Sequence, residues 1–228
     1  MKRKVAIFDI DGTVFRSSLL IELVEVLIDE GIFKSEARNL FVREKRKWQD
    51  RQGDYESYIM AVVRAFEKHI VGVKYGDFMD ASKIVVSRER DSVYRYTRDL
   101  LEDLNRKGYY MLAISQSPKA LLDIFCKRLG FDKVYGRIYE IGSTDKFTGK
   151  ITDIHLIGNK ANIVKRVIEK EGLDLKGSIG VGDTEGDISF LELVEEPICF
   201  NPNSILLRHA RINDWKVVVE RKDVVYEL

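Results

Sequence analysis

The sequence has few cysteines and no long apolar run. Only 2 cysteines occur among 228 residues, Cys126 and Cys199, and neither belongs to a CxxC or Cys/His pattern. We therefore expect no zinc site and no disulfide framework. No stretch approaches the roughly 20 apolar residues of a membrane span, and Asp9 and Asp11 interrupt the first apolar run too early for a signal peptide. These absences predict a cytoplasmic protein without a membrane partner.

An excess of charge of one sign is also missing. The chain has 38 basic and 37 acidic residues, so its net charge gives no general attraction to nucleic acid or to an anionic membrane. Its length and its 45% hydrophobic content suit one large domain, or one core domain that carries a smaller insertion.

The order of apolar patterns predicts the fold class. The run Lys4–Phe8 is apolar and β-branched, which is typical of a strand buried on both faces. From about Leu19 to Arg90 the pattern is helical throughout and predicts an inserted bundle. After Asp91 strands and helices alternate, which predicts a mostly parallel sheet with helices on both faces. Within this part, residues 137–152 resemble a β-hairpin.

The expected fold is therefore α/β, with a Rossmann-like parallel sheet core and an inserted α-helical bundle. We expect the core to comprise residues 1–15 and 91–228 and the bundle to comprise residues 16–90. In the core we expect helices at 93–106, 118–129, 160–171, 187–193 and 204–211, and strands at 110–114, 133–135, 178–181, 197–200 and 216–219.

The first polar motif, DIDGT, follows the first predicted strand. Two carboxylates, Asp9 and Asp11, stand two residues apart where the strand ends, which is where open α/β sheets place their sites. The alternative is an ordinary polar turn, since Asp-Gly is a common turn dipeptide. A calcium loop of the EF-hand type does not fit, because its glycine position is Val14 and its last carboxylate position is Leu20.

A second motif, SQSP, follows the strand predicted at 110–114. The hydroxyl of Ser115 and the first N–H groups of the following helix suit phosphate oxygens, although Ser117 could simply cap that helix. Lys160 begins another helix, where a cation opposes the helix dipole unless an anion lies near it.

The last motif, GDTEGD, places Asp183 and Asp187 after the strand at 178–181, with helix capping as the alternative. Glu185 stands where a dinucleotide-binding fingerprint needs its third glycine, so dinucleotide binding is set aside.

Chance placement of all these polar groups at strand ends of one sheet is the less favoured explanation. Clustered carboxylates repel one another unless a cation neutralises them. Because every candidate ligand is an oxygen, Mg²⁺ is the expected cation.

With these motifs in this order and spacing, the sequence resembles the haloacid dehalogenase-like (HAD) phosphatases, in particular the phosphoserine phosphatase branch, over essentially the whole chain. The resemblance implies a phosphatase that hydrolyses a small phosphomonoester with Mg²⁺. Asp9 would attack phosphorus and form an aspartyl-phosphate, while Asp11 would protonate the leaving oxygen and later activate water.

The resemblance also implies two sets of binding residues. The transferring phosphoryl group would be held by Ser115, Gln116 and Lys160. The metal would be held by Asp9, Asp11 through its backbone carbonyl, Asp183 and, in support of the others, Asp187.

The inserted bundle corresponds to the cap of that family, where substrate selection is expected to lie. Members acting on phosphoserine carry an acidic residue where this chain has Ser18. They also carry a cap arginine near the position of Val62, beyond which this chain has Arg64. These departures argue against phosphoserine and favour a related small phosphomonoester.

Two other functions fit parts of the sequence. A phosphotransferase or mutase would use the same Asp9 nucleophile and pass the phosphoryl group to an alcohol instead of water. A non-catalytic role in binding RNA or an acidic partner could use the basic stretch REKRKW at residues 43–48. The balanced net charge favours a solvated helix face, with Trp48 packed inward, over nucleic-acid binding. No feature of the sequence indicates an oligomeric state.

Overall fold

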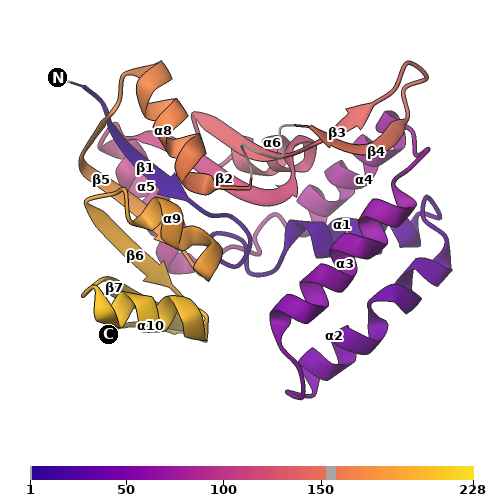
Figure 1. Cartoon of the computed structure of the whole chain (residues 1–228), viewed down its shortest axis with the longest axis horizontal. Coiled ribbons are helices and arrows are strands. Elements are labelled where there is room, and N and C mark those ends of the chain that lie inside the picture. Colours follow the sequence, from indigo (N-terminus) through magenta and orange to yellow (C-terminus); the bar gives the residue numbers. More distant parts are fainter. Residues whose placement is uncertain (1, 153–157) are drawn as a thin grey trace. The chain divides into compact units, whose positions relative to one another are not determined.

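A computed structural model describes residues 2–152 and 158–228, and these divide into two compact units (Figure 1). The first, here called the α/β unit, comprises Met1–Arg16, Asp91–Arg137 and Asp153–Leu228. The second, the helical unit, comprises Ser17–Arg90 and Ile138–Thr152.

The α/β unit contains a sheet with strand order β3-β2-β1-β5-β6-β7-β8. All neighbouring strands in it are parallel except β7 and β8, which are antiparallel. The strands are β1 Lys4–Phe8, β2 Tyr110–Pro118, β3 Lys133–Ile141, β5 Asp174–Gly182, β6 Glu196–Phe200, β7 Lys216–Arg221 and β8 Val224–Glu227.

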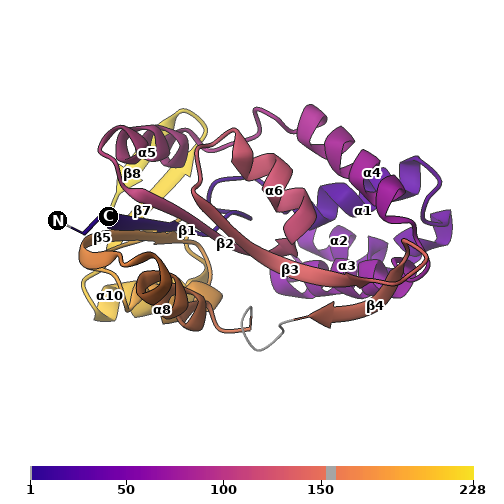
Figure 2. The same cartoon turned by 90° about the horizontal axis from the view of Figure 1, so that it is seen from above.

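Helices cover both faces of this sheet (Figure 2). They are α5 Arg95–Arg106 and α6 Lys119–Lys127 on one face, and α8 Lys160–Glu171, α9 Ile188–Leu191 and α10 Ser204–Ile212 on the other. Val5 and Ile7 of β1 join the core cluster that includes residues of α8, α9 and α10. Phe8 points to the other face, where its ring meets Phe131 at 6.0 Å. The continuous apolar run of β1 is therefore explained by burial on both sides.

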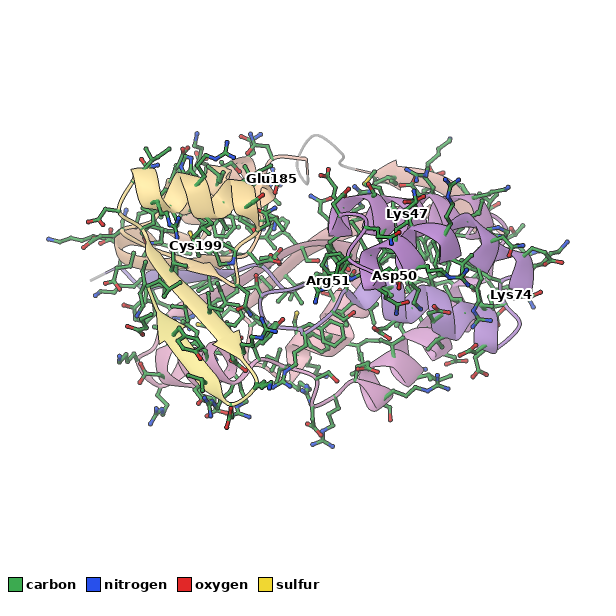
Figure 3. The ribbon with its side chains drawn as sticks, turned by 90° about the horizontal axis from the view of Figure 1, so that it is seen from below. Lys47, Asp50, Arg51, Lys74, Glu185 and Cys199 are labelled. Atoms are coloured by element: carbon green, nitrogen blue, oxygen red, sulfur yellow. The ribbon has the colours of Figure 1, made fainter. Side chains whose placement is uncertain are left out.

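The helical unit consists of a bundle and a β-hairpin. Its elements are α1 Leu19–Asp29, the 3₁₀ helix η1 Ser35–Leu40, α2 Val42–Gln49, α3 Tyr55–His69, α4 Tyr75–Arg88, the end of β3, and β4 Phe147–Thr152. The basic stretch at 43–48 lies on α2, where Lys45 contacts Glu25 at 2.8 Å and Lys47 contacts Glu44 at 3.0 Å (Figure 3). Trp48 is half-buried and packs edge-on against Tyr55.

The hairpin is the main difference from the predicted boundaries, which placed residues 138–152 in the core. Its aromatic side chains are buried against the bundle: Tyr139 meets Phe66 at 5.2 Å between ring centroids, and Phe147 meets Phe78 at 5.1 Å. The N–H of Phe147 also donates to the carbonyl of Val73. Strand alternation predicts a hairpin, but it does not say which unit covers the apolar face.

Several element boundaries also differ from those expected. The predicted strand at 110–114 continues to Pro118, so the helix that follows begins at Lys119. The strand at 133–135 continues to Ile141, and β8 was not predicted. The helical pattern at 35–49 is divided at Phe41, which is buried with φ −130° and ends η1. The α/β fold class itself is confirmed. Among the described residues, no helix is long and apolar enough to cross a membrane.

Candidate active site

Three carboxylates and one ammonium group meet at the carboxyl edge of the sheet. Asp9 follows β1 and Asp183 follows β5, its parallel neighbour, while Asp187 ends the 3₁₀ helix η2 Glu185–Asp187. Each of the three offers one oxygen that lies within 4.8 Å of the others. Lys160, the first residue of α8, places Nζ 2.5 Å from Oδ1 of Asp9 and 2.5 Å from Oδ1 of Asp187. The structure thus brings together four of the residues that the sequence identified.

Asp187 is completely buried, and both of its oxygens already have partners. Oδ1 accepts from Lys160, and Oδ2 accepts from the backbone N–H groups of Asp183 and Thr184, each at 3.0 Å. Gly182 lies so close that an added Cβ would overlap the Asp187 side chain. Asp187 therefore shapes the loop that carries Asp183 and also orients the ammonium group.

Asp183 is held by two further elements of the α/β unit. Thr13 Oγ1 donates to Asp183 Oδ1 at 3.2 Å, and Gly12, at φ +81°, faces the same carboxylate so closely that a Cβ would overlap it. From the other side, the N–H of Asn203 donates to the Asp183 carbonyl at 2.9 Å, and the Asn203 amide donates to Glu185 at the start of η2 (Figure 3). The Asp-Gly dipeptide is thus more than a turn, because only glycine permits this approach.

Ser115 lies next to Asp11. Its Oγ donates to Asp11 Oδ2 at 2.5 Å and accepts from the N–H of Ser117 at 2.9 Å. Ser117 does not cap α6 as suggested, because β2 continues through it and Pro118 takes the N-cap position without a side-chain bond. Gln116 is exposed, and its Oε1 accepts from Nε of Arg137 at 2.9 Å.

Sequence reasoning missed three of these partners, namely Thr13, Asn203 and Arg137. The contact of Thr13 with Asp183 could have been suspected, since Thr13 belongs to the motif that carries Asp9. Arg137 had no such signal. It reaches Gln116 only because β3 pairs with β2 in a register that places Arg137 opposite Pro118.

The electrostatics of the cluster leave negative charge uncompensated. Burial, together with the neighbouring carboxylates, raises the pKa of both Asp9 and Asp183 well above the usual value, although Lys160 acts in the opposite direction. Burial lowers the pKa of Lys160, but the carboxylates of Asp187 and Asp9 outweigh it and the net shift is upward. Lys160 therefore stays protonated, and its single charge faces three acidic groups.

The donor set suits a hard divalent cation. It consists of carboxylate oxygens alone, and among the described residues no His or Cys joins the group of three. Oxygen-only sites of this kind favour Mg²⁺ or Ca²⁺ over softer metals. A cation bound here would remove the mutual repulsion that raises the carboxylate pKa values.

Comparison with known proteins identifies the family. The model of the haloacid dehalogenase-like hydrolases matches residues 6–192. The chain belongs to that family. It is 25% identical to the phosphoserine phosphatase SerB1 of Mycobacterium tuberculosis, over 93% of this chain and 69% of that protein. It is 24% identical to a histidinol-phosphatase of Neisseria meningitidis, over 95% of this chain and 98% of that protein.

Solved structures agree on the fold. A phosphoserine phosphatase structure, described as a phospho-aspartyl intermediate analogue, aligns with a TM-score of 0.65 at 19% identity, covering 98% of this chain and 96% of that one. At this identity the likeness concerns the fold alone. The predicted resemblance to the family, through the order and spacing of four short motifs, is confirmed.

Proposed function

We propose that this hydrolase is a Mg²⁺-dependent phosphatase that acts on a small phosphomonoester through an aspartyl-phosphate on Asp9. The observation that carries the proposal is the placement of Lys160, whose ammonium group lies 2.5 Å from Asp9 and from Asp187 beside a third acidic group, Asp183. A buried cation among carboxylates at a sheet edge is suited to an incoming phosphate dianion. The names of the two curated relatives support phosphatase chemistry.

The metal would be held by Asp9 and Asp183, with the backbone carbonyl of Asp11 as a further ligand. Asp187 is assigned a supporting role, because both of its oxygens are engaged by Lys160 and by backbone N–H groups. When bound, Mg²⁺ supplies the positive charge that offsets repulsion between these carboxylates and the phosphate oxygens.

Asp9 is assigned the role of nucleophile. Lys160 binds Oδ1 of Asp9 and so fixes the direction of the carboxylate, whose oxygen forms the new bond to phosphorus as the bond to the leaving oxygen breaks. The same ammonium group neutralises charge on the phosphoryl oxygens. Hydrolysis of the aspartyl-phosphate by water then releases inorganic phosphate and regenerates the Asp9 carboxylate.

Asp11 is assigned the proton transfers. It gives a proton to the leaving oxygen in the first step and takes one from the attacking water in the second. Ser115 now donates its hydroxyl to Asp11, and a bound phosphate oxygen would compete for that hydroxyl. Substrate binding would thus release Asp11 to hold the proton that the leaving group needs.

The names of the two relatives support a small phosphomonoester as the substrate. One is named for phosphoserine and the other for histidinol phosphate, and both compounds are phosphate esters of small amino alcohols. Ser18 is buried, stands at the N-cap of α1 and carries no charge that could hold an amino group. We therefore propose a small phosphomonoester other than phosphoserine.

Phosphate release from a panel of phosphomonoesters tests the proposal. The panel includes phosphoserine, histidinol phosphate and p-nitrophenyl phosphate, with Mg²⁺ and with EDTA. Asp9→Asn is expected to lower kcat by about 10³-fold or more, as for other covalent nucleophiles, while Asp123→Asn on α6 serves as the matched control. Equal phosphate release by wild type and Asp9→Asn would disprove the mechanism. Strong acceleration by an added alcohol would assign the protein to the phosphotransferases instead.

A further inference from the structure

The helical unit contains a cavity of about 530 Å³ that the proposed reaction does not use. Three segments of that unit line it: residues 31–34, the connection from the end of α3 to the start of α4, and the hairpin at Lys146. The buried ring of Phe33 and the side chains of Val71 and Val73 provide an apolar wall. Its volume falls in the usual range for small-molecule sites.

Three lysines surround this cavity, Lys34, Lys74 and Lys146 (Lys74 is labelled in Figure 3). The backbones of Lys74 and Lys146 are joined by an antiparallel bridge, so these two cations arise from adjacent positions. Asp77 is the one carboxylate in the lining. Three lysines against one aspartate leave a formal charge of +2.

Several other lysines of the same unit have acidic partners. On α2, Lys45 and Lys47 contact carboxylates, and on α4, Lys83 contacts Asp80 at 2.8 Å. Within the described parts of the chain, none of the three cavity lysines has an ion pair. Like charges that share a concave surface repel one another and raise the local positive potential, which attracts anions.

The backbone adds to this potential. Helix α4 begins at the cavity with Lys74 as its N-cap residue and without a side-chain capping bond. An added Cβ at Gly76, in the first turn, would meet nothing within 4 Å, so this position of the helix is open, and the acidic residue of the same turn is Asp77, already counted in the cavity charge. The positive end of the helix dipole therefore acts together with the lysines.

We propose that this cavity binds a polyvalent phosphate anion, such as the diphosphate of a nucleotide or inorganic pyrophosphate. The lysines meet the phosphate charges, and the apolar wall can take the organic part of a larger ligand. No residue of the cavity belongs to the catalytic cluster, so the site adds a binding function to the hydrolase rather than a part of its reaction.

Calorimetric titration of the full chain with pyrophosphate, at low ionic strength and in EDTA, tests this proposal. Without divalent cations the catalytic carboxylates repel anions, so binding reports on the cavity. We expect 1:1 binding that weakens about tenfold or more in Lys34→Gln/Lys74→Gln/Lys146→Gln, since each lysine contributes a near-contact charge interaction. Lys83→Gln, with the same charge change outside the cavity, should bind as wild type does.

Two results would overturn the proposal: no binding of pyrophosphate by the wild type, or undiminished binding by the triple variant. Single Lys74→Gln and Lys146→Gln variants, each expected to weaken binding by a smaller factor, keep the test valid if the triple variant folds poorly. A parallel titration with ADP identifies the ligand source. Tighter binding of ADP than of pyrophosphate supports a nucleotide, and equal affinity supports the phosphate groups alone.

Discussion

Replacing Lys160 by methionine removes the central cation of the cluster while keeping a side chain of similar length. The ammonium group is buried, with 7% of the side chain exposed, and bridges Asp9 and Asp187, whose side chains are 8% and 0% exposed. Lys160→Met therefore leaves two buried carboxylates without their shared partner. Removal of one member of a buried ion pair typically costs about 3–5 kcal/mol of unfolding free energy.

The size of this cost should depend on pH. Burial raises the pKa of Asp9 in the folded protein, whereas in the unfolded chain it returns to about 3.9. The folded state therefore holds a proton over a range in which the unfolded state does not, and stability falls as pH rises through that range. Lys160 lowers the pKa of Asp9, so its loss raises that pKa further. In Lys160→Met, the unfolding free energy therefore falls further, by about 1.4 kcal/mol for each pH unit by which the pKa of Asp9 has risen above its wild-type value.

Urea unfolding in EDTA at pH 8 and pH 5.5 measures this effect. Trp215 lies in the α/β unit and packs against His209 at 4.7 Å, so its fluorescence reports on that unit once Trp48 is replaced by phenylalanine. We expect a penalty of about 3–5 kcal/mol at pH 8 and a smaller one at pH 5.5. A second Asp187→Asn substitution should recover part of the loss, because one unpaired carboxylate disappears. A penalty below about 1 kcal/mol, or one equal at both pH values, would refute the reasoning.

Two other substitutions test smaller parts of the structure. The side chain of Gln116 is exposed, and Arg137 holds it through Oε1. We expect the backbone N–H of Gln116, not its side-chain amide, to meet phosphate, so Gln116→Ala should keep kcat within about threefold; a loss beyond about 30-fold would contradict this. Asp54 caps α3 through the N–H of Ser57 at 2.6 Å, so Asp54→Ala should lower the melting temperature by about 2–4 °C and Asp54→Asn by less. The backbone N–H of Ser57 also lowers the pKa of Asp54 in the folded protein. The stabilisation by this cap is therefore complete above the pKa that Asp54 has in the unfolded chain, and it is lost as pH falls through the lower pKa of the folded state. Below that pH the melting temperature of the wild type should approach that of Asp54→Asn.

The fold class was predictable because the apolar sequence of β1 itself indicates a buried strand. Lys4–Phe8 is apolar at every position after the first, and so short a run, with its β-branched residues, favours a strand covered on both faces. Alternation of strands and helices after Asp91 then selects a parallel sheet. Boundaries were less predictable where neighbouring elements decide them: β2 extends to Pro118 through its pairing with β3, and β8 exists through its pairing with β7.

The hairpin at 138–152 shows why the division into units was harder to predict. Its sequence specifies strands and a turn, and the structure has both. Its place in the helical unit depends on contacts of Tyr139 and Phe147 with aromatic rings of α3 and α4, far away in the sequence. Apolar side chains specify burial but not the partner that provides it, so such contacts are invisible to a pattern read along one segment.

The assignment of Asp187 illustrates the same limit within the site. A sequence pattern places Asp183 and Asp187 four residues apart and gives each a carboxylate, so both appear equally able to bind a metal. The structure separates them through their hydrogen bonds. Oδ2 of Asp187 receives two backbone N–H groups and Oδ1 receives Lys160, whereas the side chain of Asp183 receives one hydroxyl, from Thr13. A carboxylate whose lone pairs are already shared among these donors and the Thr184 hydroxyl, at 3.4 Å, is the weaker ligand of the two. If Asp183 is the direct ligand, Asp187→Asn should weaken Mg²⁺ binding less than Asp183→Asn does, because the amide oxygen can still accept the two backbone N–H groups that hold the loop.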